Sequence, residues 1–200
     1  MTARAHRVGR HNAGVTRIVA GAHRGRPLVV PAGGTRPTAD RAREGLFSTL
    51  TSLLGLDGLE GAAVLDLYAG SGALGLEAFS RGAATVTFVD DSPRAIKAIR
   101  ANVATLKVAG ARVVESSARA FLAGAGGTTD QGGYDVALLD PPYDMEVDDV
   151  LVALGQVLAV DAVVAVERSS RAGPLVWPAG ISAVRSRRYG EATLWYGARP

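Results

Sequence analysis

The chain contains 200 residues, 48% of them hydrophobic, which is enough for one core of ordinary size and too few for two comfortable domains. It contains no cysteine and three histidines, so disulfides and thiolate metal sites are excluded and we expect no metal centre. The net charge of +3 hides an uneven distribution, because nine arginines and a single acid, Asp40, occur up to residue 43. No apolar run approaches the length of a membrane span, and the first arginines are not followed by the apolar segment of a signal peptide, so we expect a cytoplasmic protein.

The first 58 residues hold this basic part of the chain. Residues 1–15 mix Arg, His, Gly and Asn without periodicity, which predicts a flexible tail. Two β-like runs, 17–21 and 27–31, flank a basic turn and predict a hairpin. Cap residues at 38–41 precede a helix with one apolar face that ends near Leu54. The predicted division is a tail (1–15), a small basic N-terminal extension of hairpin and helix (16–58) and a main domain (59–200).

From residue 62 onward, apolar runs of strand length alternate with helical patterns. The predicted strands are 63–67, 85–89, 111–114, 134–140 and 162–167, and the predicted helices are 73–81, 93–106 and 147–158. Strands that are apolar throughout and alternate with helices predict a parallel sheet covered on both faces. Two last runs, 181–187 and 192–196, predict a closing antiparallel hairpin. The expected architecture is an α/β, Rossmann-like fold with a mostly parallel seven-stranded sheet.

A glycine-rich turn follows the first strand of this alternating region. Gly70, Gly72 and Gly75 precede a helix, and glycine there lets a ligand approach the backbone and the amino end of the helix. Asp90 follows Gly70 by 20 residues, where a ribose-binding acid belongs. This spacing fits a nicotinamide cofactor and S-adenosylmethionine equally, because both carry an adenosine ribose.

Asp66, at the end of the first strand, favours the methyl donor. A carboxylate beside the glycine turn would repel a pyrophosphate but attract a ligand that carries an ammonium and a sulfonium. The alternative role of Asp66 is to cap a helix or turn. For Asp91 we expect a cap of the following helix, and we also include it among the cofactor-binding residues. The predicted cofactor-binding residues are Asp66, Tyr68, Ala69, Gly70, Gly72, Asp90, Asp91, Ser117 and Ala118.

The motif Asp140-Pro141-Pro142-Tyr143 is the most specific signal in the chain. It follows an apolar strand, so it is expected at the same edge of the sheet as the glycine turn. The Asp140 carboxylate and the Pro141 carbonyl can both accept hydrogen bonds from one NH₂ group, which favours the pyramidal nitrogen that forms during methyl transfer. Tyr143 would stack on the face of the base. Asp140, Pro141 and Tyr143 are therefore the predicted catalytic residues.

With these motifs, the sequence from Arg17 onward resembles the bacterial 16S ribosomal RNA guanine-N2 methyltransferases, a family of class I S-adenosylmethionine-dependent methyltransferases. The resemblance extends to the segments 17–26, 36–47 and 189–194. It implies that Asp66, Gly70 and Gly72 line the methionine end of the cofactor, that Asp90 holds the ribose, and that Ser117 and Ala118 border the adenine. It also implies that Asp140 and Tyr143 handle the target guanine. The residues before Arg17 and the loop 124–133 are less typical of the family.

The resemblance also implies a role for the basic extension. Arginines there are expected to capture RNA phosphates, while the shape of the RNA and a splayed-out base give specificity. The candidates are Arg24, Arg26, Arg36, Arg41 and Arg43. The expected partner is 16S ribosomal RNA or a small-subunit assembly particle, and the protein is expected to act as a monomer.

Three other functions are compatible with parts of the pattern. A DNA adenine or protein glutamine methyltransferase would use the same motif on another planar NH₂ group. A nicotinamide-dependent oxidoreductase would explain the glycines but would leave Asp66 and the motif at Asp140 without a task. A non-enzymatic RNA-binding protein could retain a vestigial pocket.

Overall fold

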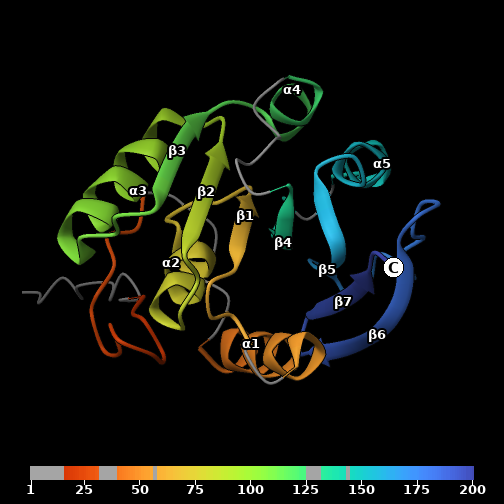
Figure 1. The fold of residues 1–200 in the computed structure, drawn as a ribbon, viewed down its shortest axis with the longest axis horizontal. Helices are drawn as coiled ribbons and strands as arrows, with labels where there is room; N and C mark the ends of the chain where they lie inside the picture. The colour runs from red at the N-terminus through yellow and green to blue at the C-terminus, as the bar shows by residue number, and fades with distance from the viewer. Residues whose placement is uncertain (1–15, 32–39, 56–57, 125–131, 143–144) are drawn as a thin grey trace, which may run out of the picture.

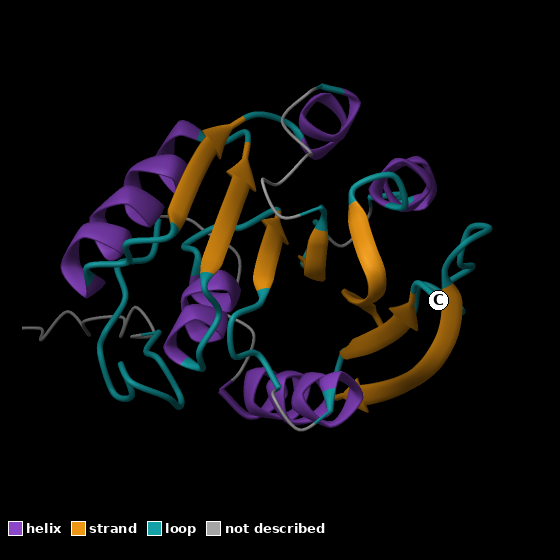
Figure 2. Cartoon of the chain, viewed as in Figure 1, coloured by secondary structure: helices purple, strands orange, loops and turns teal. Residues whose placement is uncertain are grey.

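The computed structural model describes residues 16–31, 40–55, 58–124, 132–142 and 145–200 (Figure 1). Predictions for the tail 1–15, for Arg36, for Tyr143 and for most of the loop 124–133 lie outside these described residues. Helices and strands alternate through most of the described chain, as Figure 2 shows. In chain order they are α1 (Asp40–Leu54), β1 (Ala63–Leu67), α2 (Ala73–Ser80), β2 (Thr85–Asp90), α3 (Pro93–Leu106), β3 (Ala111–Glu115), α4 (Ala118–Ala123), β4 (Tyr134–Leu139), α5 (Asp148–Leu154), β5 (Leu158–Ser169), β6 (Ser182–Tyr189) and β7 (Ala192–Ala198).

The strands form one seven-stranded sheet in the order β3-β2-β1-β4-β5-β7-β6. The first five strands of that order run parallel, and β7 pairs antiparallel with both β5 and β6. One face packs against α1, α2 and α3, while α4 and α5 cover the other (Figures 1 and 2). This arrangement confirms the predicted Rossmann-like fold and its antiparallel C-terminal hairpin.

Burial explains why the central strands are mostly apolar. All five residues of β1 are buried, since the strand has neighbours on both sides and helices on both faces. β6 is instead an edge strand with an exposed, arginine-rich sequence. In α3, the Ser92 side chain accepts a hydrogen bond from the Ala95 N–H and Pro93 occupies the first turn, as a helix start favours.

Three local expectations differ from the structure. The predicted hairpin at 17–31 is present but short: backbone bonds join Ile18 to Arg26 and Leu28 to Thr16 around a single antiparallel bridge, and the segment also bonds to α2 and α3. The short helix α4 was not predicted, since six residues carry too little periodicity to distinguish a helix. Helix α5 ends at Leu154, and β5 begins at Leu158, earlier than expected.

Candidate active site

The glycine turn and the motif at Asp140 meet at one edge of the sheet. β1 and β4 are hydrogen-bonded neighbours, and Leu67 pairs with Leu139, so the residues that follow both strands emerge side by side. They border a cavity of about 390 Å³. The described residues that line it are Tyr68, Gly70, Val89, Asp90, Asp91, Ser92, Ser116, Ser117, Ala118, Arg119, Asp140, Pro141, Pro142, Met145 and Glu167.

The glycine turn owes its shape to three residues with left-handed backbone angles. Tyr68, Gly70 and Gly72 have φ values of 61°, 57° and 78°. Tyr68 carries a side chain in this unfavourable region, as residues at binding sites often do, and that side chain borders the cavity. Gly75 lets α2 pack closely on the sheet, because a Cβ at this position would lie only 2.4 Å from the Phe88 ring. The turn is thus packed against the sheet on one side and borders the cavity on the other.

Asp66 supports this turn from below and does not line the cavity. It is 1% exposed, and its carboxylate accepts a 2.8 Å hydrogen bond from the Gly75 N–H. Burial raises the pKa of Asp66 to about 7, against an opposing effect of the Gly75 hydrogen bond. Asp66 thus acts as a turn cap, the alternative role named for it, and its contact with a cationic ligand stays a prediction. Ala69 and Gly72 also lie in the turn without lining the cavity.

Asp90 connects the turn to the second strand. One carboxylate oxygen accepts from the Gly70 N–H at 2.8 Å and the other from the Ser92 N–H at 2.9 Å. Each oxygen keeps a further lone pair, so Asp90 can still accept from a ligand hydroxyl. Asp91 is exposed at the cavity, and the prediction that it caps α3 is wrong, because Ser92 provides that cap.

The far end of the cavity is formed by the start of α4. Ser117 is the N-cap of this helix, and its hydroxyl accepts from the Ala120 N–H at 3.2 Å. Ala118 and Arg119 follow it at the cavity wall. Arg119 forms a 3.0 Å ion pair with Asp149 of α5, which ties the two helices on this face together. The predicted pair Ser117 and Ala118 therefore lies at the cavity, after β3, the strand next to the one that ends at Asp90.

Among the residues that the sequence did not single out, Glu167 and Asn102 bear most on this site. Glu167, near the carboxyl end of β5, lines the cavity beside Asp140. Asn102 of α3 is 2% exposed, and its side chain bonds the N–H and carbonyl of Val29 and the carbonyl of Ser71. It thereby ties the N-terminal extension to the glycine turn. Glu167 could have been suspected from its place after an apolar strand, whereas nothing in the sequence marks Asn102.

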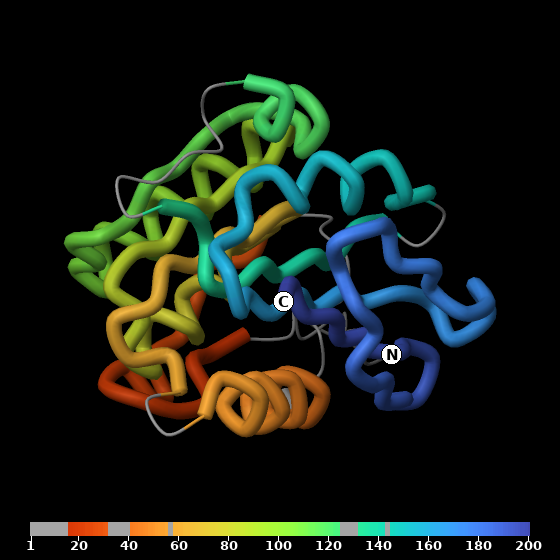
Figure 3. Tube along the Cα trace, turned by 45° about the vertical axis from the view of Figure 1, so that its right-hand side comes forward, coloured from red at the N-terminus to blue at the C-terminus, as the bar shows by residue number. Residues whose placement is uncertain are grey.

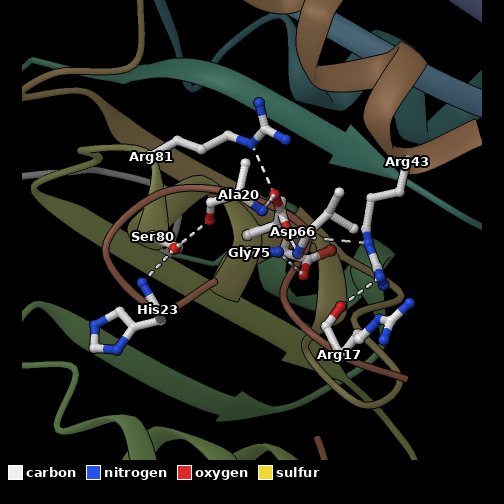
Figure 4. A network of polar contacts seen from close by, with 10 residues as sticks. Arg17, Ala20, His23, Arg43, Asp66, Gly75, Ser80 and Arg81 are labelled. Carbon is white, nitrogen blue, oxygen red and sulfur yellow. Dashed lines mark hydrogen bonds and ion pairs between the residues drawn. The ribbon is translucent and has the colours of Figure 1, made fainter. Parts of the chain in front are cut away.

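The segment 16–31 of the basic extension packs beside α1 and α2 (Figures 1 and 3). Its anchor is Glu77 of α2, which is fully buried and accepts from the Val19 and Ala20 N–H groups at 2.7 and 2.9 Å. Figure 4 shows this network, in which Arg43 reaches in from α1 and Arg81 from the end of α2.

The arginines of the extension fall into two groups. Arg24, Arg26 and Arg41 are exposed. Arg43 is 1% exposed, donates to the Arg17 carbonyl and lies 4.0 Å from a Glu77 oxygen. The predicted RNA contact of Arg43 is therefore wrong, because a buried guanidinium that neutralises a buried acid cannot reach a phosphate.

The charges around the cavity suit a cationic ligand. Four acids line it, Asp90, Asp91, Asp140 and Glu167, against one arginine, Arg119, among the described residues. This donor set fits S-adenosylmethionine, whose ribose hydroxyls need acceptors and whose ammonium and sulfonium need negative charge, and it would repel a pyrophosphate. In the described part of the chain no group of three acids or histidines could hold a metal ion, and no helix is long and apolar enough to cross a membrane.

A sheet of this order with a cavity beyond β1, β2 and β4 defines the class I methyltransferase fold. The chain belongs to the family described as Conserved hypothetical protein 95, which matches residues 16–198. Ribosomal RNA small subunit methyltransferase D of Haemophilus influenzae is 33% identical over 183 residues, which cover 88% of this chain and 90% of the relative.

Two Escherichia coli matches, one in sequence and one in structure, extend the comparison. The strain K12 protein named Ribosomal RNA small subunit methyltransferase D is 44% identical over 131 residues, or 65% of this chain. That match spans 61% of the relative, less than two thirds of its length. The solved structure of yhhF superimposes with a TM-score of 0.80 at 35% identity and covers 93% of this chain and 98% of its own. These findings confirm the family predicted from the sequence.

Proposed function

We propose that this protein transfers the methyl group of S-adenosylmethionine to the exocyclic N2 amine of a guanine in 16S ribosomal RNA, free or in a small-subunit particle. The observation that carries the proposal is the shared cavity, in which Asp140 and Pro141 face the same space as Gly70 and Asp90. Relatives named as small-subunit ribosomal RNA methyltransferases support the choice of substrate.

Each group in the cavity has a distinct task in this reaction. Asp90 and the start of α4 would hold the adenosine part of the cofactor, which when bound supplies an electrophilic methyl group. The Asp140 carboxylate and the Pro141 carbonyl accept the two N–H bonds of the amine and direct its lone pair outward. The amine nitrogen would take up the methyl group with its lone pair and lose its surplus proton to solvent, while the electron pair of the broken bond would remain with the demethylated cofactor.

The extension would supply affinity rather than chemistry. Arg24, Arg26 and Arg41 expose positive charge, and together with Arg36 we assign them to RNA phosphates. Tyr143 is assigned to stacking on the base, next to the prolines that border the cavity.

The proposal is tested by mapping methylated guanosines in 16S RNA from cells with and without the protein, followed by methyl transfer in vitro. We expect Asp140→Ala to lower transfer at least about a hundredfold, the effect of losing one preorganised contact of this kind, with RNA affinity kept within about tenfold. Asp148→Ala, which removes an exposed acid from α5, is the matched control and should stay active. Unchanged transfer by Asp140→Ala would remove this residue from the mechanism, and a modified adenine would replace the proposed substrate.

A further inference from the structure

Glu167 is an acid in the cavity that the proposed chemistry does not use. It lies near the carboxyl end of β5, is 8% exposed, and lines the same space as Asp140 and Pro141. A carboxylate kept at the wall of a substrate cavity is therefore a candidate for recognising the substrate.

The sheet register places Glu167 beside Asp140. β4 and β5 are parallel neighbours, and Leu139 pairs with Val166; Glu167 continues β5, and Asp140 is the first residue after β4. Neighbouring strands lie roughly 4.8 Å apart, and residues at paired positions project to the same side of a sheet. The two acids thus leave neighbouring strands at the same end of the sheet and line the same cavity, with Glu167 on the side of Asp140 away from the glycine turn on β1.

Two adjacent acceptors match the edge of one base in particular. Guanine presents its N1–H directly beside its N2 amine, so neighbouring ring positions both donate. Adenine and cytosine place an unprotonated ring nitrogen beside their amine, and its lone pair would face a carboxylate oxygen. A base drawn out of its stack is read by hydrogen bonds along this edge.

We propose that Glu167 accepts the N1–H of the target guanine while Asp140 and Pro141 hold its N2 amine, so that Glu167 selects guanine among the bases. The inference rests on the proposed function and names the residue that sets its base specificity. It gives the second carboxylate a role distinct from the first, since Glu167 reads the ring and Asp140 orients the reacting nitrogen.

The test uses RNAs that carry guanosine, 2,6-diaminopurine or N1-methylguanosine at the mapped position. All three keep the 2-amino group, but the second offers a lone pair at N1 and the third a methyl group. We expect the unmodified protein to show kcat/KM at least about tenfold lower on both analogues than on guanosine. The N1-methylguanosine result needs no variant, so it does not depend on how a substitution affects folding.

Glu167→Gln then assigns the effect to this side chain. Its amide can donate to the N1 of 2,6-diaminopurine, so we expect the preference for guanosine over this analogue to fall at least about tenfold. The contribution of guanine O6 cancels, because it is the same in both proteins. Glu115→Gln is the matched control, since Glu115 is an exposed acid at the carboxyl end of β3 that does not line the cavity.

The outcomes separate the inference from the function on which it rests. Equal use of N1-methylguanosine and guanosine, or an unchanged preference in Glu167→Gln, overturns the role of Glu167 and leaves the methyltransferase proposal standing. A variant equally impaired on both substrates also overturns it. Absence of transfer to guanosine RNA by the unmodified protein would instead overturn the proposed function, and the inference with it.

Discussion

Asp66 is the residue whose ionisation the fold alters most clearly. Its pKa is raised from 3.8 to about 7, chiefly by burial, so the folded protein keeps a proton that the unfolded chain releases. Stability from this group is complete below about pH 4 and is lost as the pH rises to about 7. In Asp66→Asn this loss disappears, while the amide oxygen can still accept from the Gly75 N–H. Relative to the variant, the unmodified protein should lose at most about 1.4 kcal/mol of unfolding free energy per pH unit in that window.

Urea unfolding of both proteins at about pH 4 and about pH 8 measures this difference. Comparing the two proteins removes the contributions of all other titrating groups. A stability difference that stays constant with pH would show that Asp66 is already ionised in the folded protein.

At the scale of elements, docking of the N-terminal extension depends on Glu77. This buried acid accepts two backbone N–H groups of the extension and pairs with Arg43 of α1 and with Arg81, at 2.8 Å. Glu77→Ala would leave the Arg43 guanidinium buried without its acid, and we expect a loss of about 3–5 kcal/mol in unfolding free energy. Urea unfolding checks the value.

Glu44→Ala is the matched control, because it removes an exposed acid from α1 and should change stability by no more than about 0.5 kcal/mol. A similar small effect in Glu77→Ala would mean that the extension docks through its apolar contacts alone. Ile18 and Leu28 provide those contacts, and both are buried in the core on this face.

For the whole molecule, charge is separated between two regions. Acids line the cavity, while exposed arginines lie on the extension, which contacts the glycine turn through Asn102. Arg24→Ala combined with Arg26→Ala should weaken RNA binding and reduce the slope of log affinity against log salt by about two, one for each lost phosphate contact. Titration of RNA at several salt concentrations measures both quantities.

Lys97→Ala with Arg100→Ala removes two exposed cations from α3 and serves as the control. If both double variants weaken binding equally, the extension is not a dedicated RNA-binding surface. Transfer of methyl groups at saturating RNA should be similar in all three proteins, because neither pair lines the cavity.

Much of the architecture could be predicted because its signals are local. Strands buried on both faces are mostly apolar, so β1, β2 and β4 can be recognised in the sequence. Helix α3 can be predicted from the N-cap Ser92, from Pro93 in the first turn and from its apolar face. Helix α4 is too short for such a signal. The division at residues 15 and 58 and the monomeric state stay predictions.

The sequence by itself determined the fold class, the family and the two motifs of the cavity, because each depends on residues that are close together in the chain. Only the tertiary structure decided which side chains face the cavity and which are buried beneath it. Asp66 and Arg43 proved to be internal supports, and Glu167 and Asn102 proved to be neighbours of the site. The physical reason is that exposure and partnership arise from segments far apart in the chain, and these meet only when the sheet and its helices pack.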